Sequence, residues 1–372
     1  MRVTGVEMRD FRTYARAQAR LGSGLTVVHG PNGAGKSNLL EAIYFGCTGR
    51  SPRTRSDREL VRFGEGATRV TVTIEQDGRE HTLSVGYSTP APGRPAVKRM
   101  SADGAPVERL IDVPVRPLIS VFVPDRLELL KGPPALRRAH LDQFVAALWP
   151  VRADTRRRYS RVLAQRNALL ARISSGRSGR GALATWDREL ASAAIALRED
   201  RAEAVGLLAE PFATRAEKLG VNGTLTLEYR PRSAAAGEDE FVAELEGRLD
   251  SDLERGFSGH GPHRDELAIL REGRELRVYG SQGEQRLALL ALLLAERSVL
   301  AVERGATPLM LLDDVMSELD AARRELLAQE LSGGGQSVIA TTDVEDVPGA
   351  GSPAVARIAI APGSVLQEAA AA

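Results

Sequence analysis

The hydrophobic and polar positions divide the chain into two kinds of segment. Short alternating or apolar runs typical of β-strands dominate residues 1–130 and reappear after residue 220. Residues 131–220 instead follow a helical period with few strand signals. Within the first part, residues 69–74 and 81–85 alternate and are joined through Asp77-Gly78, which predicts a β-hairpin. We therefore expect a mixed α/β protein with an inserted, mainly helical second part.

The strongest local signal lies between an apolar run at residues 25–29 and a helical pattern that begins near residue 38. The chain there matches the full G-x-x-x-x-G-K-[ST] phosphate loop and reads Gly30-Pro31-Asn32-Gly33-Ala34-Gly35-Lys36-Ser37. In such a loop, backbone N–H groups surround the phosphates, Lys36 contacts the β- and γ-phosphates, and Ser37 is placed for Mg²⁺. Because the required strand, loop and helix are all present, a chance glycine-rich turn is a poor alternative.

The charge of the whole chain is nearly balanced, with 50 Lys and Arg against 49 Asp and Glu, so net charge names no partner. Residues 131–220 differ, because they hold 17 basic and 9 acidic side chains. An arginine cluster of this kind can neutralise a phosphate backbone without reading bases. The DNA-binding candidates are Arg152, Arg156, Arg157, Arg158 and Arg161. A solvated helix face is the alternative, and it is the commoner reason for a run of charge.

Composition adds two expectations about the compartment. The single cysteine, Cys47, excludes an internal disulfide and is typical of a reducing environment. No apolar run has the length of a signal-peptide core at the start of the chain or of a membrane span anywhere. We therefore expect a cytoplasmic protein without a membrane partner.

A second anion site is expected where the apolar helix over residues 287–300 begins. Ser281, Gln282 and Gly283 precede this helix, where backbone N–H groups point outward. Ser281 with Glu284 also fits an ordinary capping box, so a plain helix start is the alternative.

Two neighbouring carboxylates follow the apolar strand pattern at residues 308–312, namely Asp313 and Asp314. A carboxylate at a strand end can hold Mg²⁺, and its neighbour can orient or deprotonate the attacking water. Paired Asp residues at a strand end are often only a capping turn. After a phosphate loop and the Ser281 motif, a nucleotide site is the better interpretation.

In this order the motifs resemble the ABC ATPase superfamily and, within it, the RecF family of DNA-repair proteins. The resemblance covers nearly the whole chain and rests on residues 10–14 (Asp-Phe-Arg-Thr-Tyr), 30–37, Arg137-Arg138 with Asp142 after residues 131–133 (Lys-Gly-Pro), 261–265 (Gly-Pro-His-Arg-Asp), 281–286 and 311–320. It implies an ABC-type head like that of SMC proteins, with mixed sheets around the phosphate loop and a helical second lobe.

The resemblance also implies roles for single residues. Lys36 and Asp314 take the catalytic positions, and Ser37 and Asp313 take the Mg²⁺ positions. The expected ATP contacts are Arg12, Gly30, Pro31, Asn32, Gly33, Ala34, Gly35, Lys36, Ser37, Ser281, Gln282 and Gly283. Ser281 and Gly283 would contact ATP held by the other subunit. Glu284 stands where the family more often has glutamine, which adds negative charge near the phosphates.

The family implies an ATP-induced homodimer that binds double-stranded or gapped DNA and releases it through slow, DNA-stimulated ATP hydrolysis. It would act with RecO and RecR in bringing RecA to gaps, in DNA replication, recombination and the SOS response. Two alternatives stay open. An SMC-like chromosome clamp would need a longer heptad-repeating arm than residues 131–220 offer, and the basic arm argues against an ABC transporter subunit.

Four segments are expected along the chain. Residues 1–130 would form the first part of the ATPase lobe, and residues 131–255 would form the helical second lobe. Residues 256–363 would complete the ATPase lobe with the Ser281 motif and the Asp313-Asp314 pair. Residues 364–372 are rich in alanine and would form a flexible tail.

Overall fold

The computed structural model describes residues 1–367 and divides them into two compact units. Unit 1 comprises Met1–Arg126, Lys218–Gly220 and the described residues from Leu300 onward. Unit 2 comprises Leu127–Glu217 and Val221–Val299.

The phosphate loop of unit 1 follows a central strand of a mainly parallel sheet with the order β15-β14-β3-β13-β12-β8. The strands are β3 (Leu25–His29), β8 (Ile119–Phe122), β12 (Leu309–Asp313), β13 (Ser337–Thr341), β14 (Ala356–Ala361) and β15 (Ser364–Gln367). All these pairs are parallel except β14–β15. Strands β12 and β13 are buried along their full length, which explains their unbroken apolar runs.

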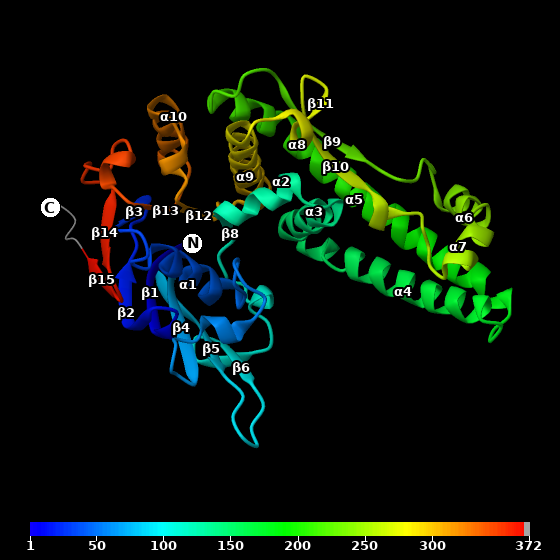
Figure 1. Ribbon diagram of the computed structural model, residues 1–372, viewed down its shortest axis with the longest axis horizontal. Coiled ribbons are helices and arrows are strands. Elements are labelled where there is room, and N and C mark those ends of the chain that lie inside the picture. The colour runs from blue at the N-terminus through cyan, green and yellow to red at the C-terminus, as the bar shows by residue number, and fades with distance from the viewer. Residues whose placement is uncertain (368–372) are drawn as a thin grey trace. The chain divides into compact units, whose positions relative to one another are not determined.

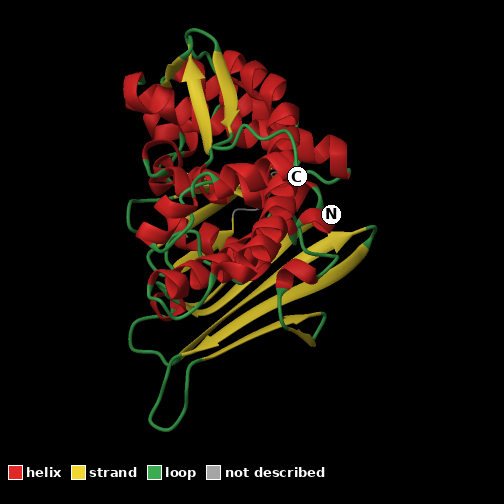
Figure 2. Ribbon diagram, turned by 90° about the vertical axis from the view of Figure 1, so that its right-hand side faces the viewer, coloured by secondary structure: helices red, strands yellow, loops and turns green. Residues whose placement is uncertain are grey.

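A second sheet of unit 1 is antiparallel and has the order β2-β1-β4-β5-β6-β7 (Figure 1). Its strands are β1 (Arg2–Phe11), β2 (Tyr14–Arg20), β4 (Ala67–Gln76), β5 (Arg79–Ser88), β6 (Val97–Ala102) and β7 (Ala105–Val107). The predicted hairpin is confirmed, because β4 and β5 pair around Asp77-Gly78 with positive φ at both turn residues. Figure 2 shows these strands as long yellow ribbons.

One face of this antiparallel sheet belongs to the core. Val6, Met8, Val70 and Val72 are buried together with side chains of helix α1 (Lys36–Thr48), whereas the alternate positions Glu7 and Arg9 are exposed. Such alternation is expected of a sheet with one covered and one open face. Helix α10 (Ala321–Ser332) connects β12 to β13.

Unit 2 is mainly helical, as the sequence pattern predicts. Its helices are α2 (Glu128–Lys131), α3 (Pro134–Leu148), α4 (Thr155–Ser174), α5 (Leu183–Lys218), α6 (Glu238–Glu246), α7 (Leu249–Arg255), α8 (Leu276–Tyr279) and α9 (Gln282–Arg304). The last residues of α5 and α9 belong to unit 1. A small antiparallel sheet contains β9 (Leu225–Arg230), β10 (Glu266–Arg271) and β11 (Arg274–Glu275).

The turn expected over residues 174–181 separates α4 from α5. Leu169 and Leu170 pack on Leu183, while Tyr159 packs near Leu190 further along α5. The two helices therefore run antiparallel.

The units differ from the expected segments in two places. Residues 256–299 cluster with the helical lobe instead of the ATPase lobe, because β10 pairs with β9 along its whole length. The tail expected from residue 364 begins as strand β15, which pairs with β14 along its whole length. Residues 368–372 of the expected tail lie outside the described residues. Among residues 1–367, no helix is long and apolar enough to cross a bilayer.

Candidate nucleotide-binding site

The phosphate loop connects β3 to α1, the arrangement that the sequence predicts. Gly35 precedes α1 with φ of 122°, and a Cβ atom there would lie 2.8 Å from the Tyr14 hydroxyl oxygen. That hydroxyl donates a hydrogen bond of 3.0 Å to the Gly35 carbonyl oxygen. Glycine therefore permits both the positive φ and the close approach of Tyr14.

Lys36 is buried against its own loop. Its Nζ atom donates hydrogen bonds to the carbonyl oxygens of Gly30 at 2.7 Å and Pro31 at 3.1 Å. Burial lowers the pKa of Lys36, and the charges of Asp314 and Asp313 oppose this change. The ammonium group is therefore held at the loop, within the electrostatic reach of both carboxylates.

Ser37 and Asp313 form a pair of oxygen donors next to the loop. The Ser37 hydroxyl donates a hydrogen bond of 2.9 Å to Asp313 Oδ1. Burial raises the pKa of Asp313, and the hydrogen bond from Ser37 opposes this shift. Mg²⁺ takes oxygen ligands and commonly binds one or two carboxylates together with phosphates, so this pair fits the ion. No cluster of three or more His, Cys, Asp or Glu that could hold a metal occurs among residues 1–367.

Asp314 is exposed directly after β12 and adopts a positive φ of 52°. Its backbone N–H donates a hydrogen bond of 3.0 Å to Ala340 on the neighbouring strand β13, and its carbonyl oxygen accepts one from Ser317. A positive φ at a residue other than glycine is uncommon and is found at strained, often functional positions.

Arg12 lies beside α1 and is fixed by a residue that the sequence patterns did not single out. Two of its guanidinium nitrogens donate hydrogen bonds of 2.8 Å each to the Glu41 carboxylate. Glu41 is buried and also accepts hydrogen bonds from Ser51 and Arg53. A carboxylate at a buried position of an otherwise apolar helix is the signal that would have pointed to Glu41. Contact of Arg12 with ATP stays a prediction.

Ser281, Gln282 and Gly283 lie at the start of α9 in unit 2, whereas the phosphate loop belongs to unit 1. The capping box is present, because Ser281 N donates to Glu284 Oε2 at 2.8 Å and Glu284 N donates to Ser281 Oγ at 3.3 Å. Glu284 also forms an ion pair with Arg271 at the end of β10. Arg271, which no sequence motif singled out, offsets the negative charge that Glu284 adds.

The DNA-binding candidates lie on or just before α4, and most of them form ion pairs. Their partners are Asp200 and Glu203 for Arg152, Asp142 for Arg156, Asp154 for Arg157 and Glu189 for Arg158. Arg161 is exposed and has no partner among residues 1–367. Arg166, further along the same basic run, is fully buried and bonds to Asp187, Asp252 and Ser258.

The motif over residues 261–265 contributes a buried carboxylate, that of Asp265, to the interior of unit 2. Asp265 is buried and accepts hydrogen bonds from the Tyr229 hydroxyl, from Arg201 and from the backbone N–H of Arg232. Arg201 also forms a two-pronged ion pair with Asp142. A buried arginine paired on several sides is a structural element, since removal of any partner would strand a charge.

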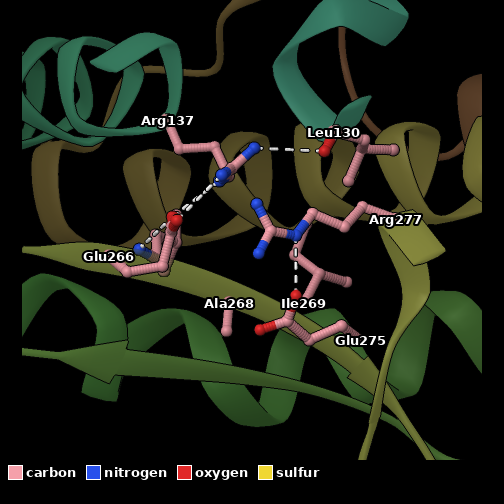
Figure 3. A pocket seen from close by; sticks show the side chains of 8 residues that line it. Leu130, Arg137, Glu266, Ala268, Ile269, Glu275 and Arg277 are labelled. Atoms are coloured by element: carbon pink, nitrogen blue, oxygen red, sulfur yellow. Dashed lines mark hydrogen bonds and ion pairs between the residues drawn. The ribbon is translucent and has the colours of Figure 1, made fainter. Parts of the chain in front are cut away.

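A small pocket in unit 2 lies among α2, α3, α8 and β10 (Figure 3). Arg137 crosses it and donates to Glu266 Oε1 at 2.7 Å and to the Leu130 carbonyl oxygen at 3.1 Å. Arg277 donates to Glu275 at 2.6 Å on the opposite side. Because these charges pair with one another, the pocket reflects packing around Arg137.

Comparisons with known proteins give consistent results. Residues 6–99 match the AAA domain family. The DNA replication and repair protein RecF of Roseiflexus castenholzii is 36% identical over an alignment of 383 positions, gaps included, which covers 93% of this chain and 94% of that protein. RecF of Streptomyces avermitilis is 36% identical over 370 residues, which cover 94% and 95% of the two chains.

Solved structures are similar along the whole chain. Two are described as the recombination mediator protein RecF-ATPrS and RecF-ATP in the RecFOR pathway. They are each 29% identical, with TM-scores of 0.84 and 0.85, and cover 99% of this chain and 98% and 97% of theirs. An Smc head bound to the C-winged helix domain of ScpA shares the fold at 16% identity, with a TM-score of 0.61 and coverage of 99% and 98%.

These similarities confirm the expected fold class, an ABC-type α/β head with a mainly helical second lobe. They also confirm the family that the motifs resemble, because relatives above one-third identity cover more than nine-tenths of the chain. The chain belongs to the RecF family of DNA replication and repair proteins.

Proposed function

We propose that this protein is an ATP-dependent DNA-binding switch of recombinational gap repair. The observation that carries the proposal is the phosphate loop with the Ser37–Asp313 pair, 2.9 Å apart, beside the buried Lys36. Relatives solved as RecF-ATP and RecF-ATPrS support ATP as the ligand.

In this proposal the triphosphate takes the place of the loop's own contacts. Lys36 exchanges its hydrogen bonds to the Gly30 and Pro31 carbonyls for phosphate oxygens. The hydroxyl of Ser37 and the carboxylate of Asp313 hold Mg²⁺, which when bound offsets the negative charge of the β- and γ-phosphates. Asp314 orients and deprotonates the attacking water. Most ABC proteins carry glutamate where this chain has Asp314, and the shorter aspartate side chain suits slow hydrolysis.

The second half of the ATP site would come from another subunit. Ser281 and Gly283 at the start of α9 would contact the γ-phosphate, aided by the backbone N–H groups there. Neither half-site alone neutralises the triphosphate, so ATP would hold two protomers together. Hydrolysis would then separate the protomers and release DNA.

The partners follow from the family. Relatives act in the RecFOR pathway as recombination mediators, which supports RecO, RecR and indirectly RecA as partners of this chain. Double-stranded or gapped DNA would be the ligand of the ATP-bound homodimer.

Sedimentation with ADP, with ATP or without nucleotide, each with and without duplex DNA, tests the proposal. We expect dimers and DNA binding only with ATP. Lys36→Met should lose both by at least tenfold, whereas Lys131→Met, which removes an exposed lysine, should lose neither. Asp314→Asn should bind ATP and keep the dimer on DNA. ATP-independent dimers, or monomers under every condition, would contradict the switch.

A further inference from the structure

A row of arginines crosses the antiparallel sheet of unit 1 at a single register position. Arg16 lies opposite Arg9, and Arg9 lies opposite Arg69. Arg69 lies opposite Gly86, which lies opposite Arg99. Residues directly opposite one another in a sheet share a face. Arg16, Arg9, Arg69 and Arg99 therefore form one line across β2, β1, β4, β5 and β6, called here the arginine row.

The arginine row lies on the open face of the sheet. The alternate positions of β1 and β4, such as Met8 and Val70, are buried in the core that contains α1. All four arginines are exposed, and 81% of the Arg9 side chain is accessible to solvent. The next line on this face contains small or polar residues: Gln18, Glu7, Thr71, Ser84 and Ser101.

The charges of the row are largely uncompensated by the side chains that the structure describes. Arg9 approaches Asp10 at 3.8 Å, and Glu7 lies on the neighbouring line of the same face. Arg16, Arg69 and Arg99 form no ion pair with any side chain that the structure describes. Like charges directly opposite in a sheet are destabilising. A sequence that keeps such a conflict without a compensating contact is expected to use it for function.

We propose that the arginine row binds the phosphate backbone of duplex DNA. Neighbouring strands are about 4.8 Å apart, so four strand spacings give the row a length of about 19 Å. A DNA strand carries a phosphate about every 3.4 Å along the helix axis, so several phosphates can face the row at once. Guanidinium groups suit this contact because they bind phosphate through two parallel hydrogen bonds.

Gly86, at the centre of the row, supports a close approach of the DNA phosphate backbone to the sheet. A Cβ atom there would meet the Thr68 carbonyl oxygen at 3.7 Å, an ordinary contact, and Gly86 does not have a positive φ. The fold therefore does not require glycine at this position. Because Gly86 has no side chain, only the Arg69 side chain, whose Nε lies 3.9 Å from the Cβ position, approaches this point of the row, and no Cβ atom stands between Arg69 and Arg99.

An acidic protein is the other ligand that four arginines could attract. Protein interfaces usually have an apolar or aromatic centre, whereas the centre of this face is the charged row itself, with a line of Gln, Glu, Thr and Ser on one side of it. On the other side, the small polar Ser88 separates Ala67 from Val97. The face therefore favours DNA. This inference rests on the proposed function, since it names the surface that would hold the DNA.

Gly86→Glu with Gly86→Gln as its matched control gives the sharpest test. Both side chains fit and favour a strand more than glycine does, but only glutamate places a negative charge in the row. We expect Gly86→Glu to weaken ATP-dependent duplex binding about tenfold, and Gly86→Gln to change it less than threefold.

Arg69→Ser combined with Arg99→Ser tests the same surface by removing charge. The slope of log affinity against log salt should fall by about 1.8 for each protomer whose row contacts DNA, because each phosphate contact contributes about 0.9. Arg79→Ser, at the far end of β5, should leave the slope unchanged. ATP-induced sedimentation of every variant should match the unmodified protein and serves as the control for folding and nucleotide binding.

The outcomes separate the two proposals. An unchanged salt slope in the Arg69/Arg99 variant, with DNA binding and ATP-induced dimers intact, overturns the arginine row and leaves the switch standing. Polyglutamate serves as a probe for an acidic protein ligand. If the Arg69/Arg99 variant loses binding to polyglutamate but binds duplex DNA normally, the arginine row is a site for an acidic protein and the DNA assignment is overturned. Failure of the unmodified protein to bind duplex DNA with any nucleotide overturns both.

Discussion

The basic run on α4 and the arginine row on the sheet are both rich in arginine, but they differ in how their charges are matched. The α4 run is contiguous in the sequence, and acids from distant segments reach it, including Asp142 for Arg156 and Glu189 for Arg158. The row is assembled from four separate strands, and three of its arginines have no ion-pair partner among residues 1–367. Density of charge along a sequence is therefore a poor guide to charge that is available to a ligand.

The difference has a simple energetic basis. An arginine that already holds a carboxylate must give up that contact before it can bind a phosphate, although an exposed pair is worth only about 0.2–1 kcal/mol. When a phosphate binds to an arginine that lies beside other arginines, two effects favour binding. The new contact is attractive, and the phosphate charge reduces the repulsion between the arginines.

Arg166→Ala should have the largest effect of the changes considered, a loss of folding stability. Such a loss would show that Arg166 holds the fold together and is not available to DNA. The variant strands the buried carboxylates of Asp187 and Asp252, so we expect a loss of about 3–5 kcal/mol in the free energy of unfolding. Urea titration measures it. Arg161→Ala, one of the exposed positions of the same helix, should change stability by less than about 0.5 kcal/mol. Equal losses in the two variants would contradict the distinction between buried and exposed arginines.

The triple change of Arg156, Arg157 and Arg158 to serine should have a smaller effect, on DNA affinity. Each arginine forms an ion pair with an acid, so we expect the salt slope of duplex binding to fall by less than about 1 in total. Fluorescence anisotropy over a salt series measures the slope. A fall larger than that of the Arg69/Arg99 variant would reverse the comparison and place the main DNA surface on α4.

The smallest expected effect is a gain in folding stability, whereas Arg166→Ala should cause a loss. Replacing Arg69 and Arg99 by serine removes repulsion, so at low salt the variant should be more stable than the unmodified protein by about 0.2–1 kcal/mol. The gain should disappear near 1 M salt, where the screening length is about 3 Å. Thermal unfolding at the two salt concentrations measures it. A destabilised variant would mean that these arginines form contacts that hold the sheet together.

The sequence-based predictions that the structure confirms depend on residues that are close together in the sequence. The phosphate loop needs only a strand, a glycine-rich turn and a helix in succession, and β3, the loop and α1 follow this order. The Asp77-Gly78 turn sets its own hairpin register. The strand before Asp313 is equally local, because an apolar run of five residues fits a buried parallel strand.

What the sequence could not predict depends on contacts between distant segments. The arginine row exists only because five strands, four of which carry its arginines, pair in one register, which no single segment encodes. The Glu41–Arg12 and Arg271–Glu284 pairs likewise join separate elements. The domain boundaries differed for the same reason, since β9–β10 pairing draws residues 256–299 into the helical lobe.

The single cysteine has a practical consequence. Cys47 is fully buried in α1, and burial raises the pKa of its thiol to about 12. Thiol reagents attack the thiolate, so the native protein should resist maleimide dyes and oxidants at neutral pH. A second cysteine placed at an exposed site would then accept a fluorophore alone, without removal of the natural one. The same thiol becomes reactive only when helix α1, which follows the phosphate loop, opens locally. The rate of Cys47 modification would therefore report how often this helix opens.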